Sequence, residues 1–294
     1  MSVSVVVASR NRRAELLETL PRHEAPVILV DNGSTDGTAD AVRSALPEVH
    51  VIALRRNVGA FARTIGVRAA TTPYVAFADD DSWWAPGALD RAVGLLDAHP
   101  AVALVTGRIL LGPSVRVDRM SLEMAAAPLG TSPGGAGPDV LGFAACAAVV
   151  RRTAFLSVDG FDPVVRFPGE EERVTLDLAD AGWLLSYVDD LVVHHHPSPS
   201  RGSAAHRRTQ IVRAALLTGC MRRPWREVLA LAASDLRADR PAQLGVLTAL
   251  PSLPGALSRR RRISPWLQRR LVELRAAQPP SVSPQSVGIE GTAS

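Results

Sequence analysis

The chain has 294 residues, 47% of them hydrophobic and 4% aromatic, so it can bury one large core with a small appendage and is not a disordered protein. All 33 basic residues are arginines, and the lack of lysine excludes a Schiff-base or P-loop lysine. Cys146 and Cys220 are too few and too far apart for a disulfide framework or a zinc site, which indicates a reducing compartment.

The N-terminal segment and the longest apolar run bear on the location of the protein. The segment MSVSVVVAS lacks a basic region and its apolar stretch is short, so we interpret it as a first strand and not as a signal peptide. The run Val140–Val150 is far shorter than the ~20 residues that span a bilayer. The sequence therefore predicts a cytoplasmic protein.

Charge is distributed unevenly along the chain. Residues 1–200 contain 17 arginines and 24 acidic residues, a balance of −7. Residues 201–294 contain 16 arginines and 5 acidic residues, a balance of +11. The acidic part is unsuited to phosphate backbones, and we expect no nucleic-acid partner.

The basic part predicts peripheral binding to the anionic inner face of the plasma membrane. The run Arg259–Arg262 carries the charge, and the apolar anchors expected beside it are Ile263, Trp266 and Leu267. The alternative is that the arginines of this part form solvated helix faces or ion pairs with the acidic part.

Predicted strands and helices alternate through the first 80 residues. The strand patterns cover Ser2–Ala8, Pro26–Asp31, Val49–Leu54 and Tyr74–Ala78. A first helical pattern begins after Ser9 or Asn11, either of which is a candidate N-cap. Two further helical patterns cover Thr38–Leu46 and Asn57–Ala70. Strands joined by single helices indicate right-handed βαβ units and a parallel sheet, in which ligands bind at the carboxyl ends of the strands.

The pattern becomes less regular towards residue 200. We predict helices over Pro86–His99 and Arg173–Ala181, and strands over Val102–Leu111, Val140–Arg152 and Leu184–His196. The Gly/Pro-rich loop Ala125–Pro138 is expected to be mobile and suited to a lid.

Three parts of the chain follow from this pattern. Residues 1–200 are predicted to form the first domain, and residues 201–277 a basic helical extension. Residues 278–294 are polar and are predicted to be a disordered tail.

Three consecutive carboxylates, Asp79, Asp80 and Asp81, follow the apolar run Tyr74–Ala78. Like charges at the end of a buried strand repel one another and lose hydration, so they require a compensating positive charge. Mg²⁺ or Mn²⁺ with a phosphate-bearing ligand supplies that charge, since hard cations prefer oxygen ligands. The alternative is a solvated acidic turn, or an N-cap for the helix that begins near Pro86.

Residues 1–200 resemble the family 2 glycosyltransferases, inverting enzymes with the A-type nucleotide-sugar fold, with a rhamnosyltransferase-like branch as one option within the family. The segments that carry the resemblance are, in order, SVVVASRNR, VDNGSTDGT, RNVGAFARTIGVRAA, YVAFADDDSWWAPGAL, VRRTAFLSVDGFD, GEEERVTLDLADAGW and VVHHH. The resemblance implies an α/β fold with a Rossmann-like, mostly parallel sheet and flanking helices. The basic C-terminal third matches no motif of the family and forms an additional α-helical extension.

The resemblance implies a metal-dependent transfer of a sugar from a nucleotide-diphosphate donor, of the UDP or TDP type, to an acceptor hydroxyl. Lipid-linked acceptors are included, and the product would belong to a cell-envelope polysaccharide, a glycolipid or a glycosylated natural product. The resemblance also assigns Asp81 as first metal ligand, Asp79 as second and His195 as a late ligand, among three histidines that otherwise only solvate a strand end. One imidazole in an oxygen-rich shell favours Mn²⁺ over Mg²⁺.

The nucleotide would be held by residues that follow the first, second and fourth strands. The resemblance implies that Ala8 and Arg10 flank the base, that Asp31 accepts from the base or ribose, and that Asp80 contacts ribose or sugar. Asp31 is alternatively only the first residue of an Asx-turn. Arg63 is assigned to the base or diphosphate, with an ordinary surface arginine as the alternative.

An inverting transfer needs one general base for the acceptor hydroxyl. The resemblance places the base at Glu171, with Glu170 as the alternate and Glu172 beside them. Acidic residues also commonly occupy a first helical turn for electrostatic reasons alone. The family's usual Glu-Asp pair is Glu170-Glu171 here, and an acidic position of the family is Arg173, a change that bears on acceptor selectivity.

Two other functions use similar elements. A nucleotidyltransferase acting on sugar phosphates also has a βαβ start and metal carboxylates, but it needs a Gly-rich phosphate loop after the first strand, and SRNRR contains no glycine. A non-catalytic nucleotide- or RNA-binding module would use the basic C-terminal part and leave the acidic cluster without a role.

Overall fold

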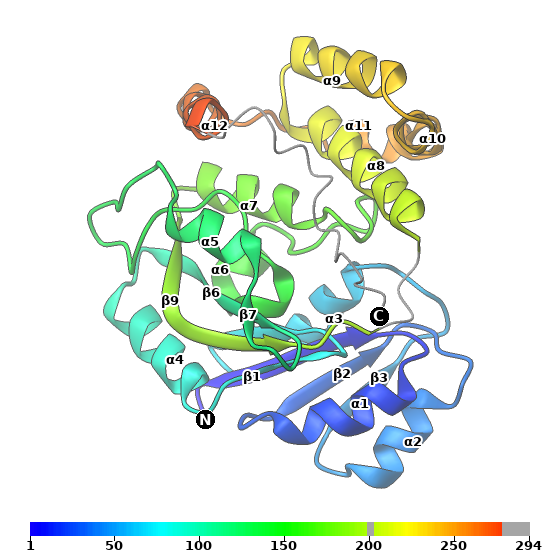
Figure 1. Ribbon diagram of the computed structural model, residues 1–294, viewed down its shortest axis with the longest axis vertical. Coiled ribbons are helices and arrows are strands. Elements are labelled where there is room, and N and C mark those ends of the chain that lie inside the picture. The colour runs from blue at the N-terminus through cyan, green and yellow to red at the C-terminus, as the bar shows by residue number, and fades with distance from the viewer. Residues whose placement is uncertain (199–202, 278–294) are drawn as a thin grey trace. The chain divides into compact units, whose positions relative to one another are not determined.

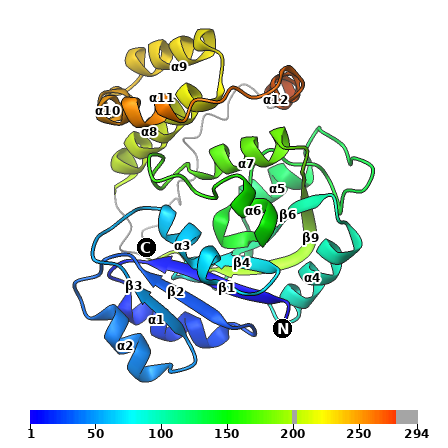
Figure 2. The same cartoon turned by 180° about the vertical axis from the view of Figure 1, so that it is seen from behind.

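The computed structural model describes residues 1–198 and 203–277 of the chain (Figures 1 and 2). The chain divides into two compact units, residues 1–201 and residues 202–294. The predicted disordered tail, residues 278–294, lies outside the described residues.

The first unit is built on one nine-stranded sheet. The strands are β1 Val3–Ser9, β2 Val27–Asp31, β3 His50–Ala53, β4 Tyr74–Ala78, β5 Ser82–Trp84, β6 Val102–Leu111, β7 Arg116–Val117, β8 Ala148–Arg151 and β9 Leu184–His195. Their order is β3-β2-β1-β4-β8-β6-β9-β5, and β7 pairs with β6 outside this path.

The first four strands are parallel, as the alternation of strands and helices predicts. Beyond β4 the sheet is more mixed than predicted, because β8 lies antiparallel between β4 and β6, and β5 and β7 are also antiparallel to their neighbours. Only the β6–β9 pairing in this half is parallel. Antiparallel strands do not require a crossover helix, so the alternation of patterns carries no information about them.

Helices cover both faces of this sheet (Figures 1 and 2). Those of the first unit are α1 Arg13–Thr19, α2 Thr38–Ala45, α3 Phe61–Ala69, α4 Ala88–Ala98, α5 Arg119–Ala125, α6 Arg152–Ser157 and α7 Glu171–Asp180. Short 3₁₀ turns cover Leu20–Arg22 and Ala145–Ala147. Gly182, at φ +86°, ends α7: its N–H donates to the carbonyl of Ala179, and that of Trp183 donates to Leu178.

Two predicted segments are shorter in the structure by five residues or more. The predicted helix Asn57–Ala70 begins only at Phe61, because the Asn57 side chain accepts from the Gly59 N–H and the Val58 N–H donates to Asn32. The predicted strand Val140–Arg152 retains only the four residues of β8.

The predicted N-cap of α1 is wrong. The structure places Arg12 at that position, without a side-chain hydrogen bond to the helix. Asn11 has a left-handed backbone with φ +56°, and the Ser9 hydroxyl donates to Asp80 instead.

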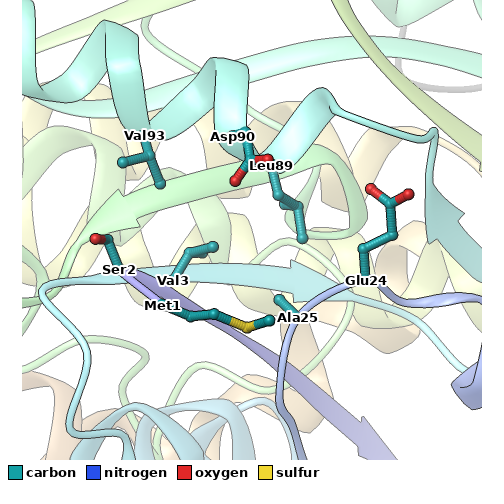
Figure 3. Close-up of a pocket in the computed structure, with 8 residues that line it drawn as sticks. All are labelled: Met1, Ser2, Val3, Glu24, Ala25, Leu89, Asp90 and Val93. Carbon is teal, nitrogen blue, oxygen red and sulfur yellow. The ribbon is translucent and has the colours of Figure 1, made fainter.

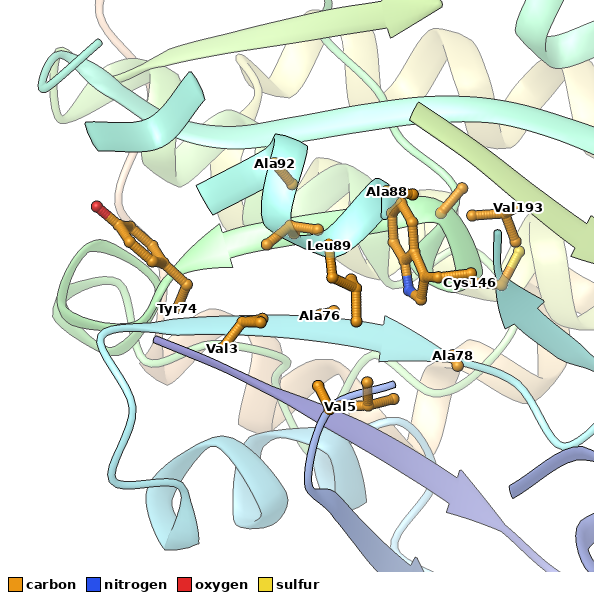
Figure 4. Packing of buried hydrophobic residues seen from close by; sticks show 14 of the residues in the cluster. Val3, Val5, Tyr74, Ala76, Ala78, Ala88, Leu89, Ala92, Cys146 and Val193 are labelled. Carbon is orange, nitrogen blue, oxygen red and sulfur yellow. The ribbon is translucent and has the colours of Figure 1, made fainter. Parts of the chain in front are cut away.

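The core between the sheet and α4 is made of small and branched side chains (Figure 4). Val3 and Val5 of β1, and Ala76 of β4, pack against Leu89 and Ala92 of α4. Leu16 of α1 and Val42 of α2 belong to the same buried cluster, so these helices cover this face as well. On the opposite face, the rings of Phe77, Phe155 and Phe161 contact one another with centroids 5.4–5.6 Å apart.

The second unit is helical throughout its described part, as predicted. Its helices are α8 Ala204–Arg222, α9 Trp225–Arg237, α10 Arg240–Ala249, a 3₁₀ turn Leu250–Ser252, α11 Leu253–Ser258 and α12 Pro265–Ala277. The side chains of Ser203 and Asp239 cap α8 and α10. Across residues 1–198 and 203–277, no helix combines the length and the hydropathy needed to cross a bilayer.

Gly66 allows α3 to approach the sheet closely, and this contact yields a stability prediction. A Cβ at Gly66 would lie 2.5 Å from Cγ1 of Val6, whereas a Cβ at Gly94 of α4 meets nothing within 4 Å. We expect Gly66→Ala to destabilise the protein by about 1–3 kcal/mol through overpacking. Gly94→Ala should be neutral or stabilise by up to ~1 kcal/mol through helix propensity. Urea unfolding midpoints of the two variants measure this, and equal midpoints would contradict the close packing.

Candidate active site

The three carboxylates occupy a tight turn between β4 and β5. The Asp79 N–H donates to the Ser82 hydroxyl over 2.8 Å, and the Ser82 N–H donates back to the Asp79 carbonyl. β5 then pairs antiparallel with β9 in a register that places Ser82 opposite His195. This three-residue strand has no sequence signal of its own, yet it brings the end of β9 to the carboxylates.

Asp79, Asp81 and His195 form a cluster in which one ligand atom from each lies within 4.8 Å of the others. Nε2 of His195 is 3.1 Å from an Asp81 carboxylate oxygen. The second Asp81 oxygen accepts from the Ser198 N–H over 3.0 Å, and the Asp81 carbonyl accepts from the His196 N–H. The sequence did not indicate Ser198, because its contact to Asp81 spans 117 residues.

Asp80 is directed away from this cluster, towards β1, although these residues form a turn and not the extended segment that the prediction assumed. Its carboxylate accepts from the Ser9 hydroxyl over 2.7 Å, and its carbonyl accepts from the Thr19 hydroxyl over 2.9 Å. The pKa of Asp80 is raised to about 6, chiefly by burial; the Ser9 hydrogen bond opposes this shift, whereas the charges of Asp79 and Asp81 add to it. Ser9 and Thr19 therefore hold the turn against β1 and α1.

Arg63 of α3 is buried and forms ion pairs with two carboxylates. One guanidinium nitrogen is 2.5 Å from Asp79 and another is 3.2 Å from Glu170, whose side chain is fully buried. Burial alone would lower the pKa of Arg63, but Asp79, Glu170 and Glu171 together raise it. The surface-arginine alternative for this residue is therefore wrong.

Glu170 and Glu171 begin α7 beside this guanidinium. Burial raises the pKa of Glu170 well above its usual range, and the Glu171 charge adds to the effect against Arg63. Burial likewise raises the pKa of Glu171, opposed by backbone hydrogen bonds and by Arg63. One oxygen of Glu170 is buried without a hydrogen-bond partner in the described structure, whereas Glu171 is half-buried. A single cation thus faces more carboxylate charge than it can neutralise.

Arg173, in the same helix, has a different environment. Its guanidinium is 2.6 Å from Asp177 one turn later and donates to the carbonyl of Val158. Both side chains of this pair are 2% exposed. Arg173 is therefore an interior residue and does not offer its charge to an acceptor directly.

The loops after β1 and β2 are joined by hydrogen bonds. Asp31, at the end of β2, is buried, and its carboxylate accepts over 2.9 Å from the N–H of Ser34, three residues later and not two as in an Asx-turn. Nε of the exposed Arg10 donates to the Gly33 carbonyl, and Ala8 precedes it at the end of β1. The adjacent Asn32 amide, not singled out from the sequence, bonds the loop that precedes α3.

His194 and His196 lie away from the cluster, against Trp83. The Trp83 ring stacks on His194 with centroids 5.5 Å apart and meets His196 edge-on at 4.7 Å. The Arg22 guanidinium lies 4.1 Å from the same ring. Trp84 is buried and donates from Nε1 to the Phe77 carbonyl, so it is a packing residue.

The predicted lid is attached to the sheet. The Ala136 N–H donates to the Ser186 hydroxyl, and Asp139 forms a β-bridge with Ser186. Gly137 lies so close to the Tyr187 carbonyl that a Cβ would be 2.2 Å from its oxygen. These contacts lie towards the start of β9, whereas His195 is at its end, so the loop does not border the cluster.

A surface pocket lies at the opposite end of β1 from Ser9 (Figure 3). Met1, Ser2 and Val3 line it together with Glu24, Ala25, Leu89, Asp90 and Val93. It is at the amino end of the strand, and none of the carboxylates described above lines it. The acidic and polar side chains described above lie instead at the carboxyl ends of β1, β2 and β4.

One curated relative and two solved structures illustrate the similarity. The N-acetylglucosaminyl-diphospho-decaprenol L-rhamnosyltransferase of Mycobacterium tuberculosis is 29% identical over 248 residues, covering 69% of this chain and 79% of the relative. A mannosyltransferase from Pyrobaculum calidifontis, in complex with GDP-Man and Mn²⁺, superposes with a TM-score of 0.56 at 22% identity, covering 97% of this chain and 77% of its own. S. aureus TarS 1-349 in complex with UDP-GlcNAc superposes with a TM-score of 0.56 at 18% identity. The superposition covers 87% of this chain and 82% of the TarS chain.

The structural similarities support the predicted A-type fold. The family model for glycosyl transferase family 2 matches residues 4–157, more than half of the chain. These residues include β1 to β4, the three carboxylates and Arg63. The chain therefore belongs to glycosyltransferase family 2.

Proposed function

We propose that this glycosyltransferase moves a sugar from a nucleotide-diphosphate donor to an acceptor hydroxyl, with inversion at the anomeric carbon and with a divalent cation. One observation carries the proposal: the Asp79–Asp81–His195 cluster is joined through the buried Arg63 to the Glu170–Glu171 pair. A site for the departing diphosphate and a candidate proton acceptor are thus held together. Membership of the family disfavours both a nucleotidyltransferase and a non-catalytic binding module.

The cluster fits a divalent cation. Two carboxylate oxygens and one imidazole nitrogen converge within 4.8 Å, and Asp81 with Asp79 would be the first ligands, with His195 as the third. The single nitrogen favours Mn²⁺ over Mg²⁺, and Mn²⁺ accompanies GDP-Man in the archaeal mannosyltransferase. When bound, such an ion stabilises negative charge on the leaving diphosphate as a Lewis acid.

The donor nucleotide would lie along the loops after β1 and β2. Ala8 and Arg10 would flank the base, Asp31 would accept from the base N–H or a ribose hydroxyl, and Asp80 would contact ribose or sugar. The hydrogen bond from the Ser34 N–H does not compete with this role, because it fixes the direction of the Asp31 carboxylate. UDP and TDP donors present the same base edge. The rhamnosyltransferase relative makes TDP-deoxyhexoses the first donors to test, beside UDP-hexoses.

Glu171 would accept the proton of the acceptor hydroxyl. It is more accessible than Glu170, and its raised pKa suits a base that must take up a proton near neutral pH. Glu170 is fully buried against Arg63 and would orient the start of α7. Glu172 is the third acidic residue of this turn and has no proposed role.

The acceptor would be a lipid-linked diphospho-sugar, which the name of the mycobacterial relative suggests. Its use would place the reaction at the cytoplasmic face of the plasma membrane, in the formation of a cell-envelope glycan. A soluble natural product is the second acceptor class to test, and donor hydrolysis measured without any acceptor is independent of this choice.

The first functional prediction concerns the metal carboxylate. In a panel of UDP- and TDP-sugars with Mn²⁺, we expect one donor to be hydrolysed and its nucleotide diphosphate to raise the melting temperature. Asp81→Asn should keep the fold but lower turnover by about 10²–10³-fold or more, because it removes one anion from the metal shell. The metal model would be excluded if hydrolysis by the wild type in EDTA, and hydrolysis by Asp81→Asn, were both as fast as hydrolysis by the wild type with Mn²⁺.

The second prediction separates the two glutamates. Glu171→Gln should leave donor affinity nearly unchanged and lower kcat by about 10²–10⁴-fold, because the lost group acts only in the proton-transfer step. Glu170→Gln should mainly lower stability, since it leaves Arg63 with one anionic partner fewer. Calorimetric donor binding and kcat are the measurements. An inactive Glu170→Gln enzyme beside an active Glu171→Gln enzyme would move the base by one residue.

The third prediction concerns the buried ion pairs of Arg63. Arg63→Met leaves Asp79 and Glu170 without their cation and should destabilise the protein by about 3–5 kcal/mol. Adding Glu170→Gln should recover part of that loss, because one of the stranded charges is then removed. Urea unfolding of the single and double variants measures the coupling. Strictly additive effects would show that the two side chains do not interact.

A further inference from the structure

The second unit exposes much more apolar surface than the first. Nine large hydrophobic side chains are exposed among residues 203–277, against five among residues 1–198. The nine are Trp225, Leu229, Leu236, Leu244, Leu247, Leu250, Leu257, Trp266 and Val272. Apolar side chains concentrated on one small unit mark an interaction surface.

Helix α9 carries one stripe of this surface. Trp225, Leu229 and Leu236 are spaced four and seven residues apart and therefore lie on one side of the helix. Their exposed fractions are 48%, 65% and 49%. Arg226 and Arg237 each follow a member of the stripe and are exposed beside it. Apolar residues flanked by arginines are typical of helices that lie in a membrane interface.

The consecutive helices α10 and α11 carry a second stripe. Their buried side chains, which pack within the unit, are Ala242, Val246, Ala249 and Ala256. The exposed side chains of α10, of the 3₁₀ turn that follows it and of α11 include Leu244, Leu247, Leu250 and Leu257. Small residues thus face the unit's interior while four leucines face outward, the reverse of what a solvated helix requires.

The charge around these stripes has one sign. Residues 203–277 contain 15 arginines and 4 acidic residues. Arg226, Arg240, Arg262 and Arg269 are exposed, and none has an ion-pair partner within the part of the chain that the structure describes. The arginines are therefore not consumed by ion pairs inside the unit, and their charge is available to a partner.

The anchors expected from the sequence are largely wrong. Ile263 and Leu267 are 7% and 0% exposed, and of the three only Trp266 faces outward. The arginine run is also partly used inside the unit: Arg260 donates to the carbonyls of Cys220 and Arg223 at the end of α8 and lies over the Trp225 ring. Cations at a helix C-terminus stabilise it, so part of this run has a structural role.

We propose that the outward stripes of α9 and α10–α11 bind an anionic lipid bilayer. An anionic bilayer supplies both phosphate charge for the arginines and a hydrocarbon boundary for the leucines. Nucleic acid would supply only the charge, and a second copy of this strongly basic unit would bring like charges together. This inference rests on the proposed function only in one respect: a lipid-linked acceptor would be located in such a bilayer. Its test does not require catalytic turnover.

The test is sedimentation of the full-length protein with vesicles. We expect binding to phosphatidylglycerol-containing vesicles at low salt, weaker binding at high salt and little binding to pure phosphatidylcholine. Leu244→Gln/Leu247→Gln/Leu250→Gln/Leu257→Gln and, separately, Arg226→Gln/Arg240→Gln/Arg262→Gln should each lower the partition coefficient by roughly tenfold or more. Leu229→Gln/Leu236→Gln is the second apolar variant if the quadruple variant lacks the native circular dichroism spectrum.

Matched controls come from exposed residues of the first unit, namely Leu122→Gln for the apolar surface and Arg43→Gln/Arg68→Gln/Arg116→Gln for charge. These should bind as the wild type does. The proposal is overturned if wild type stays in the supernatant, if the leucine variants bind undiminished, or if wild type is a dimer that the leucine variants convert to a monomer. Donor hydrolysis should be the same in every variant as in the wild type. A lack of donor hydrolysis would contradict the catalytic proposal and not the proposed membrane binding.

Discussion

The buried guanidinium of Arg63 is the interaction on which the candidate site depends. It contacts Asp79 at the end of β4 and Glu170 at the start of α7, which are 91 positions apart in the chain. Burying such a pair brings little net stability, because desolvation of the charges offsets their attraction. Its effect is positional, since the carboxylates cannot separate without leaving a charge unpaired in the interior.

Helix α3 makes this placement possible through three successive features. Gly66 lets the helix approach Val6 and Val30 of the sheet. Thr64 donates to the Phe161 carbonyl and accepts from the Phe161 N–H, which fixes the segment that leads towards α7. Arg63 is next to Thr64, so the hydrogen bonds of Thr64 also fix the position of Arg63.

The sequence predicted those parts of the fold and site that depend on local patterns. β4 and β6 have the predicted bounds because uninterrupted apolar runs define them. Alternation along an extended segment predicted that Asp80 diverges from Asp79 and Asp81, but in the structure these residues form a turn, and the Ser9 hydroxyl binds the Asp80 carboxylate. β5 was not predictable, because three residues form a strand only through their pairing with β9, which is about 110 positions away.

Long-range contacts account for the remaining differences. Asn32 bonds the segment before α3 from 26 positions away and so shortens the predicted helix. Ile263 and Leu267 are buried, and the Ile263 N–H donates to the Arg222 carbonyl at the end of α8, a contact that no pattern of charge and hydropathy near the arginine run reveals. Arg63 illustrates the same point, since an arginine on a helix cannot be assigned to the interior until its distant partners are known.

The two thiols of the chain have a practical consequence. Cys146 and Cys220 are 5% and 3% exposed, and burial raises the pKa of both. Only the thiolate reacts quickly with alkylating reagents, so the native protein offers them almost no target. A cysteine introduced at a single outward position would therefore be the one labelled site, without removal of the native thiols. The protein that retains both native cysteines is therefore suited to site-specific attachment of spin labels and fluorophores that report local solvent access.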